Sequence, residues 1–249
     1  MTPNRKLDES LRGTLPVAET EVAADECWQS TGFCAEAWPL LTEVSSSSPL
    51  VLAVYASPSL QDPLAGSLPP INSNRFELMR RLNDALPELA LRFWQVLQAE
   101  PPESLLLSLP LNPPEQRWCV DVLWLDQAEM VAVNTQFRQK PEPTDVLSFP
   151  LLDAAGVHGP LLLLPELHLG SVLVSLDWVC QVAAESPATA GLESLHFEND
   201  LALLLALERV VHGWLHLLGV HHHTVPDYNR VVAIQRQVVY DGPKACYPQ

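Results

Sequence analysis

Residues 212–223 read HGWLHLLGVHHH and lie at the end of the most apolar long stretch of the chain. The apolar spacing predicts a buried helix over residues 196–218. Gly219 suits the left-handed conformation that ends many helices, so we expect the helix to end there. His212 and His216 are four residues apart, which places them about 6 Å apart along the axis and within about 40° of the same face. Two imidazoles on one helix face can bind one metal ion.

A third imidazole can come from the run of three histidines that follows Gly219, where the chain can fold back. Spacing alone does not decide which of His221, His222 and His223 would bind. Histidine nitrogens bind zinc at about 2.0–2.1 Å, and three protein ligands with one open position are typical of catalytic zinc sites. The pattern therefore favours a metal site over a pair of core histidines and an exposed histidine run.

Gly213 bears on the kind of chemistry to expect. Zinc peptidases that carry two histidines on a helix place a glutamate, their general base, directly after the first histidine. In this chain Gly213 stands at that position. A peptidase-like hydrolase thus lacks its main catalytic group and is only an alternative.

A second polar stretch, NTQFRQKPEPTDVLSFP, spans residues 134–150 between a predicted helix and a predicted strand. It contains the basic pair Arg138 and Lys140, and arginine can bind a phosphate through its planar fork of donors. Cations near a helix C-terminus also stabilise the helix, and on this stretch alone that is the preferred interpretation.

Composition limits the possible partners of the 249-residue chain. Thirty acidic and fourteen basic residues give a net charge of −16, which excludes a general basic coat for nucleic acid. Five cysteines without a Cys-x-x-Cys spacing argue against a disulfide framework or a cysteine zinc cage. Without a secretory signal or a credible membrane span in the sequence, we expect a cytoplasmic protein that binds neither membrane nor DNA.

We expect two regions along the chain. Residues 1–48 are acidic, lack sustained periodicity and predict a flexible N-terminal extension, whereas residues 49–249 predict one domain. Strands and helices alternate there, which predicts an α+β fold, a small mixed sheet packed with about five or six helices. The predicted strands cover residues 50–55, 118–125, 145–149, 161–164 and 169–175, and the predicted helices cover residues 75–100, 127–137, 176–184, 196–218 and 227–240.

Taken together, the two stretches resemble the YbeY family of bacterial rRNA maturation factors. The resemblance covers roughly residues 50–245 and rests on two long motifs in the right order. The matching positions are Asn134, Phe137, Arg138, Lys140, the stretch 143–150, His212, Gly213, Leu215, His216, Leu217, Gly219 and His222.

The resemblance implies a zincin-like domain and a zinc-dependent, single-strand-specific endoribonuclease. It implies a role in maturation of the 3′ end of 16S rRNA and in ribosome quality control, with single-stranded rRNA, the small ribosomal subunit and its associated factors as partners. Carried over by position, His212, His216 and His222 bind one zinc ion per chain, and Arg138 is the catalytic arginine. A non-catalytic ribosome assembly factor with a structural zinc is a further alternative. Three histidines without a fourth protein ligand argue against it.

The chain departs from the family pattern near the third ligand and in the last helix. The family usually has aspartate at Ser171, tyrosine at Val220, aspartate at His221, methionine at Val231 and glutamate at Gln235. The three histidines and Arg138 are retained.

Overall fold

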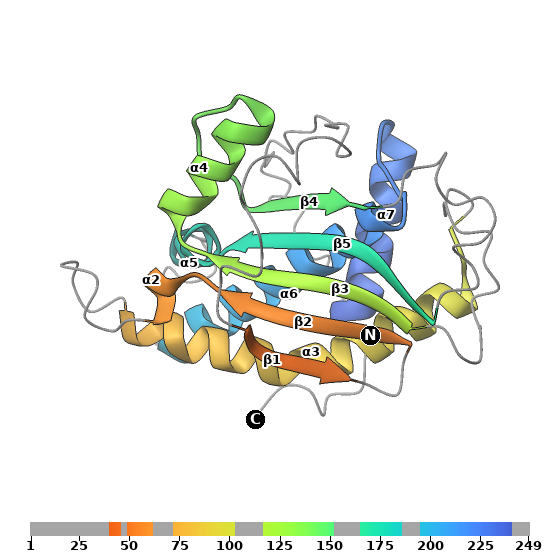
Figure 1. Ribbon diagram of the computed structural model, residues 1–249, viewed down its shortest axis with the longest axis horizontal. Coiled ribbons are helices and arrows are strands. Elements are labelled where there is room, and N and C mark those ends of the chain that lie inside the picture. The colour runs from red at the N-terminus through yellow and green to blue at the C-terminus, as the bar shows by residue number, and fades with distance from the viewer. Residues whose placement is uncertain are drawn as a thin grey trace, which may run out of the picture.

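The computed structural model describes residues 40–45, 49–61, 72–102, 117–151, 165–185 and 195–240. Its strands form one mixed sheet in the order β1-β2-β3-β5-β4 (Figure 1). The strands β2, β3 and β5 are parallel, and the edge strands β1 and β4 run antiparallel to their neighbours. The strands are β1 (Leu40–Ser45), β2 (Leu50–Ala56), β3 (Arg117–Leu125), β4 (Val146–Pro150) and β5 (Glu166–Ser175), and the helices are α2 (Pro58–Gln61), α3 (Asn72–Ala99), α4 (Gln127–Arg138), α5 (Leu176–Glu185), α6 (Leu195–Leu217) and α7 (Val225–Val239).

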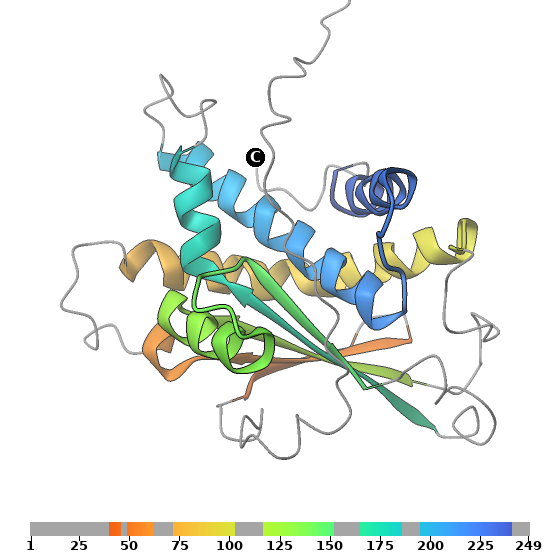
Figure 2. The same cartoon turned by 90° about the horizontal axis from the view of Figure 1, so that it is seen from above.

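Helices cover the two faces of the sheet unequally. The helices α3, α5, α6 and α7 lie on one face, and α4 lies on the other (Figure 2). Alternation along β3 explains the two layers, because Trp118, Val120 and Trp124 pack in the larger core while Leu123 and Leu125 pack beneath α4. The predicted α+β architecture with a mixed sheet is therefore confirmed. No helix in the described ranges is long and apolar enough to cross a membrane.

The edge strand β1 lies inside the segment that the sequence predicts as an extension. It pairs antiparallel with β2, and Leu41 packs against the main core. The sheet thus begins upstream of the boundary expected at residue 49. The strand is short and ends at the first of four consecutive serines, so its sequence carries little periodicity. The rest of the expected extension and the predicted strand 161–164 lie outside the described residues.

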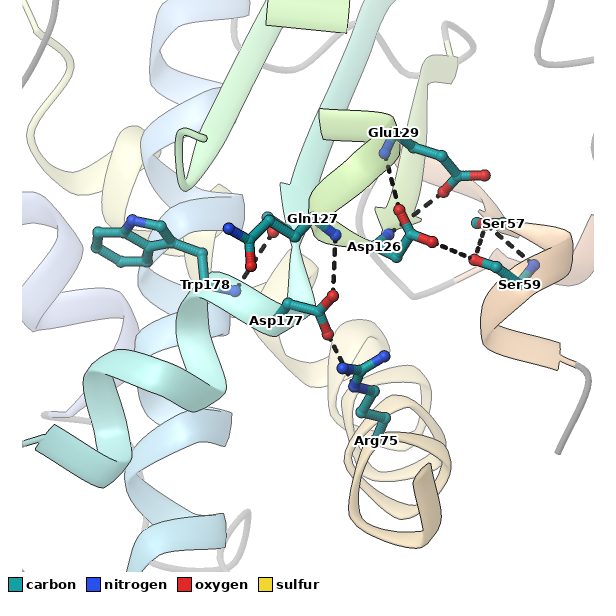
Figure 3. A network of polar contacts seen from close by, with 9 residues as sticks. Ser57, Ser59, Arg75, Asp126, Gln127, Glu129, Asp177 and Trp178 are labelled. Atoms are coloured by element: carbon teal, nitrogen blue, oxygen red, sulfur yellow. Dashed lines mark hydrogen bonds and ion pairs between the residues drawn. The ribbon is translucent and has the colours of Figure 1, made fainter. Parts of the chain in front are cut away.

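A network of polar contacts fixes the start of α4 (Figure 3). Asp126 caps the helix and accepts a hydrogen bond from Ser59 Oγ at 2.7 Å. The backbone N–H of Gln127 donates to Asp177 Oδ2 at 2.9 Å, and Asp177 also pairs with Arg75 Nε at 2.7 Å. These contacts join the start of α4 to α2, α3 and α5.

Gly213 allows α6 to pack closely on β5. A Cβ atom at this position would lie 2.4 Å from Val172 Cγ1, and Val172 is itself fully buried. Valine is stiff at χ1 and sits in the middle of the sheet, so it cannot move aside easily. The glycine is therefore required by the distance between helix and strand.

Replacing Gly213 with alanine should destabilise the fold by about 1–3 kcal/mol, as other overpacked cores are destabilised. The measurement is urea unfolding of the metal-free protein, which excludes any contribution from a bound ion. Val172→Ala is the matched control, since it removes the methyl groups that a new Cβ would meet. The double variant should be destabilised by less than the sum of the two single variants. If the two destabilisations add, the contact with Val172 is not the reason for the glycine.

Candidate metal centre

The C-terminal end of α6 turns the chain back on itself. Gly219 has a φ of 78°, in the left-handed region. The N–H of Val220 donates to the carbonyl of Leu215 at 2.9 Å, and the N–H of Gly219 donates to the carbonyl of His216 at 2.9 Å. This pair of bonds is the Schellman motif, which satisfies the last carbonyls of a helix. The predicted end of the helix at Gly219 is confirmed, and the turn returns the following histidines toward α6.

The structure brings His212, His216 and His222 together. His212 Nε2 lies 2.9 Å from His216 Nε2 and 3.4 Å from His222 Nε2, and one ring nitrogen from each residue lies within 4.8 Å of the others. Tetrahedral zinc with Zn–N bonds of about 2.0–2.1 Å requires nitrogens about 3.3–3.4 Å apart. The three rings therefore form a group that can hold a metal ion.

His221 and His223, which flank His222 in the sequence, do not belong to this group. His221 Nδ1 is 3.0 Å from the Nδ1 of His216, on the side of that ring away from His212. In this position His221 can hydrogen-bond the ring and orient it, as groups behind a metal-binding histidine commonly do. His223 is exposed and lies outside the group. The fold thus distinguishes three histidines that spacing alone left equivalent.

Burial keeps the first two histidines neutral. Burial, followed by the neighbouring His216 and His222, lowers the pKa of His212 well below its ordinary value. Burial, followed by His221 and His222, lowers the pKa of His216 to about 3. Metal binding requires the neutral imidazole. At pH 7 both rings are in the form that accepts an ion.

Gln235 of α7 supports His212 from behind. The Gln235 side chain is buried, and its Nε2 donates to the carbonyl of Glu208 at 3.0 Å. Its amide oxygen then remains for His212, and this hydrogen bond partly opposes the lowering of the His212 pKa. Glutamine keeps an acceptor oxygen where the family pattern has glutamate. No spacing signal predicts this contact, because α7 is a separate helix.

Arg138 is the last residue of α4, and its charge is one of the causes that lower the pKa of His216. The guanidinium therefore lies close enough to His216 to act on its ring electrostatically. Gln139 follows with a φ of 57° and ends the helix. Lys140, the other predicted cation, is half-buried two residues further on.

The loop after α4 is fixed to α6. Asn134 Nδ2 donates to the carbonyl of Glu142 at 2.8 Å, which holds the start of the loop. Asp145 at its end pairs with Arg209 Nε at 2.5 Å, and the guanidinium of Arg209 lies 5.7 Å from the Trp178 ring centroid. Arg209 precedes His212 by one helical turn. Sequence reasoning missed this pair, since the two residues are far apart in the chain.

An aromatic side chain borders the group. The Tyr228 ring of α7 lies 5.5 Å from the His222 ring in an edge-to-face arrangement and is 42% exposed. Its position in a polar segment, VPDYNR, carries no motif signal. An exposed ring next to the histidine group is a surface on which a planar ligand can stack.

The comparisons with known proteins agree with the motifs. The family model described as Endoribonuclease YbeY matches residues 103–241, more than half of the chain. The chain belongs to the YbeY family. The family model includes Arg138, His212, His216 and His222 within its matched range.

Individual relatives match over about half of the chain. Endoribonuclease YbeY of Trichormus variabilis is 34% identical over 128 residues, which cover 51% of this chain and 64% of that protein. The protein of the same name from Chelativorans sp. is 35% identical over 120 residues, 48% of this chain and 63% of that protein. The matches thus span somewhat less than two thirds of these relatives. A solved structure from Thermotoga maritima, TM1509, is 22% identical over 66% of this chain and 82% of its own, with a TM-score of 0.34.

Proposed function

We propose that the chain is a zinc-dependent endoribonuclease that cleaves single-stranded RNA. The observation that carries the proposal is the convergence of His212, His216 and His222 near Arg138, in a member of a family whose name includes endoribonuclease. Within this proposal the three histidines bind one zinc ion per chain, and Arg138 is the catalytic arginine.

The site residues have different roles in this proposal. When bound, zinc supplies a Lewis acid for a phosphoryl oxygen. Arg138 binds the non-bridging oxygens of the same phosphate through its planar fork and stabilises the negative charge that grows on them. His221 and Gln235 hold the rings of His216 and His212 in the orientation that directs Nε2 toward the centre of the group.

Unpaired RNA fits the surroundings of the group. Bases of a single strand can be splayed out and stacked on aromatic side chains, whereas bases of a duplex are held in the helix. The exposed ring of Tyr228 beside His222 offers such a surface. Because the chain has a net charge of −16, we expect binding to be local to this site and to involve few phosphates.

The biological setting follows from the family resemblance. We propose that the substrate is the 3′ end of 16S rRNA on the small ribosomal subunit in the cytoplasm, with a part in ribosome quality control. An acidic protein gains little from long-range attraction to RNA. A ribosomal partner that brings the RNA strand to the site would supply the missing affinity.

The peptidase alternative has no structural support at its key position. Any side chain at residue 213 begins with a Cβ atom, and a Cβ atom there would lie 2.4 Å from Val172 Cγ1. A glutamate at this position would therefore overlap Val172. The general base of zinc peptidases therefore has no room in this packing of α6 on β5.

Cleavage by the purified zinc-loaded protein tests the proposal. We expect internal cleavage of an unpaired RNA and at least tenfold slower cleavage of the same sequence in a duplex, with loss of both on chelation and recovery on adding zinc. Cleavage that survives chelation, or that is equal for strand and duplex, would contradict the proposal.

A further inference from the structure

The face of the sheet that carries α4 has a polar half. On this face Leu123, Leu125 and Leu173 pack beneath the helix. Towards the start of β3 and β5 the same face presents Cys119, Glu166 and His168 instead, with one potential ligand atom from each lying within 4.8 Å of the others. A thiol, a carboxylate and an imidazole are thus gathered on a surface for which the nuclease mechanism has no use.

Strand pairing holds these side chains in place. Cys119 is paired with His168, and Glu166 is paired with Arg117, in the parallel ladder of β3 and β5. The residues between them point to the opposite face and are almost fully buried, namely Trp118, Val120, Leu167 and Leu169. A ligand set built on buried, paired strands is positioned before any ion arrives. Cys119 is half-buried, and Glu166 and His168 are exposed, so an ion can reach them from solvent.

We propose that Cys119, Glu166 and His168 form a second metal site that binds a thiophilic divalent ion such as Zn²⁺. Thiolate, imidazole and carboxylate are the three ligand types that proteins use for zinc. The thiolate selects against Mg²⁺ and Ca²⁺, which prefer oxygen ligands. Three ligands leave one coordination position for water or for a further group.

The charges around the three residues favour a dication. Burial, followed by the charge of Glu166, raises the pKa of the Cys119 thiol. Arg117 opposes this rise, and Asp121 and Glu43 add to it. Cys119 is thus protonated at pH 7 without an ion. Binding of the dication forms the metal–sulfur bond and releases this proton to solvent. The carboxylates of Glu166 and Glu43, which disfavour the free thiolate, attract the cation.

The competing arrangement is an ion pair. Arg117 Nη1 lies 3.2 Å from Glu166 Oε1, and both side chains are 49% exposed. Exposed pairs of this kind contribute little to stability. The Glu166 carboxylate can therefore turn from Arg117 to a metal ion at small cost. Removing Arg117 should make the site stronger.

Metal titration of the full-length, metal-free protein tests the inference. We expect two zinc ions per wild-type chain by equilibrium dialysis, and one in either Cys119→Ser or His216→Ala. Cobalt should give a thiolate-to-metal charge-transfer band that Cys119→Ser abolishes and Cys180→Ser, a change at the half-buried cysteine of α5, leaves intact. Zinc affinity at this site should fall at least tenfold in His168→Gln and should rise in Arg117→Ala.

The result separates this site from the nuclease site. Cys119→Ser should still cleave RNA, whereas His216→Ala should keep the cobalt–thiolate band. One ion per wild-type chain, or a thiolate band that survives Cys119→Ser, would overturn the second site without affecting the proposed nuclease. Two bound ions without RNA cleavage would instead overturn the nuclease and leave the second site standing.

Discussion

Replacing His216 with alanine should remove the ion held by the histidine group and reduce RNA cleavage about a thousandfold or more. Lewis-acid stabilisation of a phosphoryl transition state is worth several kcal/mol, so its loss has an effect of that order. His216 contacts His212 through one ring nitrogen and His221 through the other, since its Nε2 is 2.9 Å from the Nε2 of His212 and its Nδ1 is 3.0 Å from the Nδ1 of His221. The measurements are zinc content after dialysis and the initial rate of cleavage.

The matched control is His223→Ala. His223 belongs to the same run of histidines but is exposed and lies outside the group. This variant should retain its zinc and its activity. If His216→Ala cleaves RNA at the wild-type rate, the histidine group is not the catalytic centre. If His223→Ala loses the ion, His222 has been assigned wrongly as the third ligand.

Replacing Arg138 with alanine should lower the rate of cleavage by about a hundredfold to a thousandfold, the usual effect of removing one donor that stabilises transition-state charge. The zinc content should be unchanged, because Arg138 acts on the phosphate. Arg138→Lys should cleave only slightly faster than Arg138→Ala, since an ammonium group cannot form the planar two-donor contact with a phosphate. Initial rates and zinc content, measured on the same preparations, give the answer.

Arg80→Ala provides the control for net charge. Arg80 is an exposed residue of α3 whose guanidinium pairs with Glu77 and Asp84. Its removal changes the net charge of the protein by the same amount and should leave cleavage unaltered. Zinc loss in Arg138→Ala would show that Arg138 holds the end of α4 against the histidines, which is a structural role.

The helix that carries His212 and His216 could be predicted because its signals are local. Apolar periodicity and Gly219 define α6 to within one residue at each end, and the spacing of His212 and His216 places both on one face. The third histidine could not be chosen from spacing, since the choice depends on the path of the chain after Gly219. The Schellman turn fixes that path, and it directs His222 to the group.

Features that depend on distant pairing could not be predicted. The neighbourhood of Cys119, Glu166 and His168 exists only in the register of β3 against β5, which carries no local signal. Gln235 and Tyr228 reach the histidine group only because α7 packs beside α6. The edge strand β1 was missed for the same reason, as six residues without clear alternation become a strand only when β2 is available to pair with them.

The contact between Gly213 and Val172 also limits how this protein can evolve. The two-histidine helix motif of zinc peptidases differs from residues 212–216 by one glutamate after the first histidine. That substitution alone would place a side chain against Val172 in the middle of β5. A lineage starting here would first need a smaller residue at position 172, a loss of packing with no benefit of its own. Two changes that are harmful singly are rarely acquired in succession. The fold thus keeps descendants of this sequence from acquiring protease chemistry by a single step.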